Sequence, residues 1–254
     1  MNGDPEEEQM LLVRLAKPDA VIPFCQVVTQ FGDIITCRVK RKHLLEVYNS
    51  PLTFSVKAPR LIPATRYGKE ESGSSDDEHT NPSRRFNTSY TGKGIYAAFV
   101  DWGFDIAHTN LRNADGTTRF KCIWDQNAPY DGNKYGYGCM YRRDEINHAV
   151  STGTPYTTLG YHPGRQDVFG NGMHGTHVVD IAAGTPVVGE GGVATETTLI
   201  GVQLGNNFVN GSDLALGDSV RLNEALDFIH VNTTDAPCVI NMSLGSHGDS
   251  HTGK

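Results

Sequence analysis

Short apolar segments alternate with helical ones after residue 94, and this alternation limits the fold more than any other feature. Four segments have the length and apolar content of buried strands: 95–100, 120–124, 198–204 and 238–244. Two segments between them are predicted to be helices: 176–183 and 213–231. Because strands that alternate with helices form parallel sheets with crossover helices, the pattern predicts an α/β fold.

The N-terminal part of the chain has a different pattern. Three apolar segments, 20–28, 34–39 and 52–56, are predicted to be strands, and residues 40–48 are predicted to form a helix. These predictions give a small α+β segment over residues 1–64. Residues 65–93 form an acidic linker rich in glycine and serine, in which no periodicity is visible. A further domain then occupies residues 94–254.

Net charge and cysteine content argue against several kinds of partner and metal site. A net charge of −7 argues against binding to nucleic acid or to an anionic membrane, since both need a concentrated excess of lysine and arginine. The five cysteines are an odd number without a C-x-x-C pair, so the sequence suggests neither a disulfide framework nor a zinc ribbon. No metal or other cofactor is therefore expected; structural calcium remains open, although no motif supports it.

The N-terminus carries no sign of export. Residues 1–8 are acidic and lack the basic and apolar regions of a secretory signal. The sequence also lacks an apolar run of the ~18 residues that a membrane span needs. We therefore expect a cytoplasmic protein with no membrane partner.

Two residues occupy positions at which parallel sheets carry their chemistry. Asp101 directly follows an apolar strand, and His174 begins a helix after the loop Gly170–Gly172. Ligands and reacting groups gather at the carboxyl ends of parallel strands, where loops meet helix N-termini. A carboxylate and an imidazole at such a place look like two of the three members of a serine-protease triad.

Three motifs resemble those of the subtilisin-like serine proteases, the subtilase or S8 family. Asp101-x-Gly103, preceded by Thr91-Gly92-Lys93-Gly94 and followed by His108-x-x-Leu111, resembles the aspartate region of that family. The segment 174–184 resembles its histidine region, and 240–245 resembles the strand that pairs with the bound peptide. The motifs occur in the order of the family and extend over residues 91–245.

This resemblance implies a fold and a set of roles. The fold would be a three-layer subtilisin-like domain with a parallel sheet, incomplete at the C-terminus, and residues 1–64 would resemble a prodomain. His174 would be the general base, and Asp101 would orient it. Ser243, Leu244 and Gly245 would offer backbone groups to an extended peptide or protein substrate, which implies broad specificity.

The chain departs from the family pattern at three places. Trp102 stands where the family usually has a small hydroxylated residue, and Asp180 stands where many members have glycine. The more serious departure is that residues 246–254 contain no Gly-Thr-Ser nucleophile turn. Loss of the nucleophile alone costs roughly 10⁶ in turnover, so this chain alone is expected to be inactive. We expect the serine downstream of this chain or in a partner.

Other functions remain as alternatives. The first is a non-catalytic pseudoprotease, or an inhibitory module that binds peptides without cleaving them. Residues 248–254 match the start of a phosphate-binding loop but lack the Ser/Thr and the helix that should follow. A zinc site at His174 and His177 is disfavoured, because their i, i+3 spacing differs from that of H-E-x-x-H.

Overall fold

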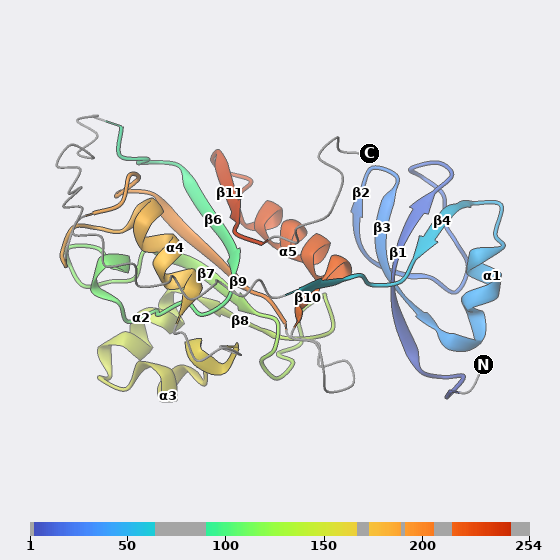
Figure 1. The fold of residues 1–254 in the computed structure, drawn as a ribbon, viewed down its shortest axis with the longest axis horizontal. Helices are drawn as coiled ribbons and strands as arrows, with labels where there is room; N and C mark the ends of the chain where they lie inside the picture. The colour runs from blue at the N-terminus through green and yellow to red at the C-terminus, as the bar shows by residue number, and fades with distance from the viewer. Residues whose placement is uncertain (1–2, 64–89, 167–172, 189–190, 206–214, 245–254) are drawn as a thin grey trace, which may run out of the picture. The chain divides into compact units, whose positions relative to one another are not determined.

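The computed structural model describes residues 3–63, 90–166, 173–188, 191–205 and 215–244 (Figure 1). Several sequence predictions lie outside these ranges: the linker up to residue 89, the glycine loop 170–172, Gly245 and the loop-like segment 248–254. In the part of the chain that is described, no helix is long and apolar enough to cross a membrane.

A five-stranded sheet has the strand order β11-β6-β9-β7-β8. Its strands are β6 (Tyr96–Asp101), β7 (Phe120–Asp125), β8 (Cys139–Arg142), β9 (Thr198–Gln203) and β11 (Cys238–Met242). Strand β6 runs parallel to both β11 and β9. The predicted α/β class with a parallel sheet is therefore confirmed. The strands β6, β7 and β9 are almost entirely buried, as expected for a sheet with both faces covered.

Helix α4 (His174–Ala183) lies against strand β6 (Figure 1). Its buried positions include Gly175, Val179 and Ala183, whose spacing of four places them on one face of the helix. Two further helices, α2 (Arg143–Ser151) and α3 (Pro155–Leu159), precede it in the chain. Short 3-10 turns occupy Thr109–Leu111 and Pro163–Gln166.

A four-stranded antiparallel sheet forms the N-terminal part, in the order β2-β3-β1-β4. Its elements are β1 (Glu8–Leu15), β2 (Gln26–Phe31), β3 (Ile34–Lys40), the 3-10 turn Arg41–His43, α1 (Leu44–Tyr48) and β4 (Thr53–Lys57). One face carries the apolar core, made by Leu11, Val13, Ile35, Cys37 and Val47 among others.

The structure of this part differs from the sequence analysis at two places. The strand β1 was missed, because the sequence Glu8–Leu15 mixes polar and apolar residues without regular alternation. The strand predicted at 20–28 begins only at Gln26. Phe24 has a φ of 63°, a left-handed conformation that does not continue a strand, which explains the late start.

The described chain divides into two compact units. One unit combines residues 1–63 with 124–140 and 204–234, and the other contains 64–123, 141–203 and 235–254. The first unit includes helix α5 (Ser219–Asn232), preceded by the short strand β10 (Ala215–Asp218), which pairs with β5 (Leu61–Pro63). The helix predicted from residue 213 therefore begins late. Asp218 caps it by accepting hydrogen bonds from the backbone N–H groups of Val220 and Arg221, both at 2.9 Å.

A buried ion pair joins the N-terminal sheet to α5 inside this unit. Arg38 on β3 meets Glu224 through two hydrogen bonds, Nη1 to Oε1 at 2.8 Å and Nη2 to Oε2 at 3.1 Å. The Glu224 side chain is 0% exposed and that of Arg38 is 11% exposed. The hydroxyl of Tyr137 also donates to Glu224 at 2.7 Å, and Arg38 donates to the carbonyl of Tyr135 at 3.0 Å. Each charge is thus both paired and hydrogen-bonded.

We expect the substitution Arg38→Met to destabilise the first unit by about 3–5 kcal/mol, because it leaves the Glu224 carboxylate buried without its counter-charge. The measurement is urea denaturation followed by the fluorescence of Trp124, which stacks on Tyr135 inside the unit. The matched control is Arg14→Met, which removes an exposed arginine paired with Asp33 and should have a much smaller effect. Equal losses in the two variants would contradict the importance of the buried pair.

Candidate active site

The structure brings Asp101 and His174 into direct contact. Asp101 is the last residue of β6 and is 1% exposed, while His174 is the first residue of α4, with a side chain that is 15% exposed. Nδ1 of His174 lies 2.6 Å from Oδ1 of Asp101. An ionised carboxylate can only accept, so the ring donates from Nδ1, and Nε2 becomes the ring nitrogen that can take up a proton. This is the arrangement of a general base oriented by a carboxylate.

Backbone hydrogen bonds connect the start of α4 to the turn that follows β6. The N–H of Gly175 donates to the carbonyl of Trp102 at 2.6 Å, and the N–H of Thr176 donates to the carbonyl of Gly103 at 3.0 Å. The Thr176 hydroxyl also donates to the Gly103 carbonyl at 2.8 Å and accepts from the N–H of Asp105 at 2.7 Å. These bonds hold the histidine and the aspartate at a fixed separation.

Two glycines permit this close approach. Gly103 has a φ of +74°, and a Cβ there would lie 2.9 Å from Cα of Met173. A Cβ on Gly175 would lie 2.8 Å from the carbonyl oxygen of Trp102 and 2.9 Å from Cε1 of Phe104. Real side chains essentially never make such contacts, so any larger residue at either position must move the backbone.

Trp102 and Asp180, two of the three departures noted in the sequence, both have defined contacts. The ring of Trp102 stacks on that of His174, with centroids 5.4 Å apart and an interplanar angle of 17°. The backbone N–H of Trp102 also donates to Oδ1 of Asp101 at 2.7 Å. Asp180 accepts a hydrogen bond from Asn110 at 2.9 Å, which connects α4 to the 3-10 turn after β6.

Two of the three residues expected to bind substrate, Ser243 and Leu244, directly follow strand β11. Within the described residues, strand β11 lies at the edge of the sheet, and its Met242 pairs with Val100 on β6. The same register carried one residue further places Ser243 next to Asp101. Ser243 is exposed and its hydroxyl donates to Oδ1 of Asn241 at 3.0 Å, while Leu244 is partly exposed. Gly245 lies outside the described residues.

Other candidate groups for chemistry are less suitable. His177 is exposed, and the described residues contain no group of three potential metal ligands. Burial raises the pKa of the Cys122 thiol to about 12, so that thiol is a poor nucleophile. Burial, followed by a hydrogen bond to Asp105, raises the pKa of the Tyr156 hydroxyl.

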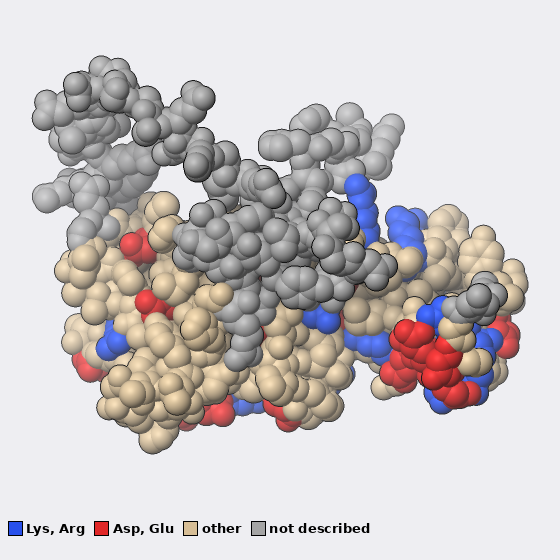
Figure 2. Space-filling model, turned by 60° about the horizontal axis from the view of Figure 1, so that its bottom comes forward, with Lys and Arg blue, Asp and Glu red and all other residues tan. Residues whose placement is uncertain are grey.

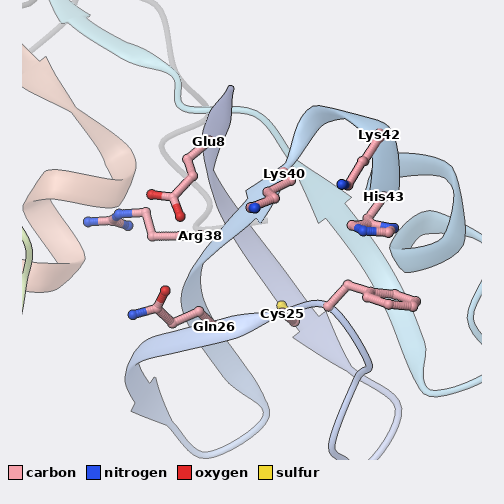
Figure 3. A pocket seen from close by; sticks show the side chains of 8 residues that line it. Glu8, Cys25, Gln26, Arg38, Lys40, Lys42 and His43 are labelled. Carbon is pink, nitrogen blue, oxygen red and sulfur yellow. The ribbon is translucent and has the colours of Figure 1, made fainter. Parts of the chain in front are cut away.

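A pocket of about 470 Å³ lies in the N-terminal segment and is lined by Cys25, Arg38, Lys40 and Lys42 among others (Figure 3). Its cations are already engaged: Arg38 with the carboxylate on α5, and both lysines with Glu6. Lys40 and Lys42 lower the pKa of Glu6 to about 2. Figure 2 shows acidic and basic side chains next to one another on the face that it draws. The pocket therefore has few charges left for an anionic ligand.

Sequence reasoning missed the polar groups around the turn after β6. Gln203 is fully buried at the end of β9, where its register partner is Asp101. Tyr161 donates to Oε1 of Gln203 at 2.7 Å. A polar residue at the end of an otherwise apolar strand was the available signal, since buried amides are found where they have hydrogen-bonding partners.

Comparisons with known proteins bear on the family and the fold of this chain. A family model described as the subtilase family matches residues 92–254. Among solved structures, the chain is similar to the CspB protease of Clostridium perfringens, with 28% sequence identity and a TM-score of 0.53. The match covers 68% of this chain and 33% of that protease, so the chain spans about a third of the length of that relative. No curated protein matches the sequence.

We expect Gly175→Ala to destabilise the protein by about 1–3 kcal/mol, because the added methyl group must displace the backbone of the turn. Alanine favours a helix over glycine by about 1 kcal/mol, so a destabilised variant would show that the close approach outweighs helix propensity. The measurement is thermal unfolding. His177→Ala, at an exposed position of the same helix, is the control and should change stability by less than about 0.5 kcal/mol. A stabilised Gly175→Ala variant would contradict the tight contact.

Proposed function

Because the chain belongs to the subtilase family, we propose that the protein is a serine-type endopeptidase in which His174 is the general base and Asp101 orients it. The single observation that carries this proposal is the 2.6 Å contact between Nδ1 of His174 and Oδ1 of Asp101. A serine hydroxyl is a weak nucleophile near neutral pH, and it needs an imidazole that removes its proton during attack. In this geometry Nε2 of His174 accepts that proton, and Asp101 stabilises the imidazolium that results.

The nucleophilic serine of this proposal lies downstream of residue 254 or in a partner chain. The coverage supports this proposal, because the chain spans only 33% of the length of the CspB protease. His174 later returns the proton to the leaving amine, so the reaction consumes only water and a peptide bond. This mechanism requires no metal or other cofactor.

The proposed substrate is an extended peptide that pairs with the edge strand β11. An exposed sheet edge offers unpaired N–H and C=O groups, and a peptide can add to it as a further strand. Ser243 and Leu244 follow this strand beside Asp101, so a peptide bound there would pass the base. This form of recognition depends mainly on the peptide backbone, and the proposal therefore includes broad sequence specificity.

We expect the full-length gene product, or this chain together with the partner that carries the serine, to react with a fluorophosphonate probe. His174→Ala should abolish most of the labelling, and Asp101→Asn should reduce peptide turnover by roughly 10⁴, because the amide favours the wrong tautomer of the histidine. The matched control is His177→Ala, which should retain full labelling because its side chain is exposed.

Two outcomes would contradict the proposal. A full-length protein that does not react with the probe and does not cleave peptides would favour a pseudoprotease that binds without cleaving. Full labelling of His174→Ala would show that another group acts as the base.

A further inference from the structure

Two buried polar atoms of opposite hydrogen-bonding character lie on neighbouring strands at the candidate site. Within the described residues, Oδ2 of Asp101 and Nε2 of Gln203 both lack a hydrogen-bond partner. Asp101 is 1% exposed and Gln203 is 0% exposed. A buried carboxylate oxygen needs a donor, and a buried amide nitrogen needs an acceptor, because burial without a partner costs free energy. Asp101 therefore has an acceptor without a donor, and Gln203 has a donor without an acceptor.

The sheet register places these two residues side by side. Asp101 ends β6, Gln203 ends β9, and the two are direct partners in the parallel pair. Adjacent strands lie about 4.8 Å apart, and paired residues point to the same face of the sheet. No direct hydrogen bond joins Oδ2 of Asp101 to Nε2 of Gln203. One buried water between the two side chains would give each atom its missing partner.

The other end of the Gln203 amide is already fixed. Its Oε1 accepts from the N–H of Gly103 at 3.3 Å and from the hydroxyl of Tyr161 at 2.7 Å. A backbone N–H can only donate, so the atom that faces Gly103 must be the oxygen. The amide is thereby oriented with its NH₂ group available. Tyr161 is held in turn by Phe104, whose N–H donates to the hydroxyl at 3.2 Å.

We propose that Gln203 is a positioning residue for the base: its Nε2–H donates to one buried water, the water donates to Oδ2 of Asp101, and this bridge fixes the carboxylate that orients His174. Oδ1 of Asp101 already accepts from His174 and from the N–H of Trp102. A donor to Oδ2 prevents the carboxylate from rotating about its Cβ–Cγ bond, because both oxygens are then bonded. The effect on catalysis rests on the proposed function. The water-mediated contact between Gln203 and Asp101 does not.

The contact is tested on this chain without any activity. In proton NMR, the Nδ1–H resonance of His174 reports the bond to Asp101. We expect Gln203→Met to shift or broaden that resonance. Gln126→Met is the matched control: Gln126 is also buried and also accepts from a glycine N–H, but both ends of its amide have partners in the other compact unit. An unchanged resonance in a folded Gln203→Met variant would overturn the proposal.

The consequence for catalysis is tested on the full-length gene product. Gln203→Met should reduce kcat about tenfold with little change in KM, since one hydrogen bond contributes about that factor. The variant Gln203→Glu distinguishes a role of Gln203 in positioning the base from a role in folding alone. When protonated, its carboxyl group donates as the amide does, so its kcat relative to the unsubstituted protein should rise as the pH falls. Gln203→Met has no such group and should show no rise.

The outcomes distinguish the two proposals. If the unsubstituted full-length protein has no peptidase activity, the proposed function fails, and the NMR comparison still decides on Gln203. If the protein is active and Gln203→Met has the kcat of Gln126→Met, the positioning role is refuted. The same holds if the relative kcat of Gln203→Glu does not depend on pH.

Discussion

The contact between the start of α4 and the turn after β6 determines the geometry of the candidate site. His174 and Asp101 belong to different elements, and their 2.6 Å hydrogen bond exists only because the two backbones approach closely. Two glycines make that approach possible, and backbone bonds between residues 102–103 and 175–176 maintain it. The position of the imidazole therefore follows from backbone packing more than from its own side-chain contacts.

A row of residues at the carboxyl edge of the sheet extends the site to both sides of this pair. By register, Ser243 follows β11, Asp101 ends β6 and Gln203 ends β9. Ser243 is exposed and Gln203 is fully buried. A parallel sheet thus places an exposed serine, a carboxylate and a buried amide at neighbouring positions.

The N-terminal sheet packs against a helix from much later in the chain, α5. It shares a compact unit with α5, and the pair of Arg38 and Glu224 connects residues 186 positions apart. Such a pair is costly to break, because either charge left alone would be buried without a partner. The stability of this unit consequently depends on residues from both ends of the chain.

The sequence predicted the central strands, because runs such as Tyr96–Val100 are continuous and apolar. It failed at β1, whose mixed composition hides the pattern, and at Phe24, whose positive φ only the folded chain reveals. Asp101 and His174 were predicted from their motifs, whereas the role of Gln203 depends on strand register, which local patterns do not specify. Polar contacts between distant segments form only when the chain folds.

The protonation of the His174 ring tests the central claim most directly. In this chain at neutral pH, nitrogen NMR with labelled histidine distinguishes the two ring nitrogens. The contact with Asp101 predicts that the neutral ring carries its proton on Nδ1 and not on Nε2, which is the form that can act as a base. Loss of the Nδ1 signal in Asp101→Asn would agree with that contact. A neutral ring with its proton on Nε2 in the unsubstituted chain would contradict it.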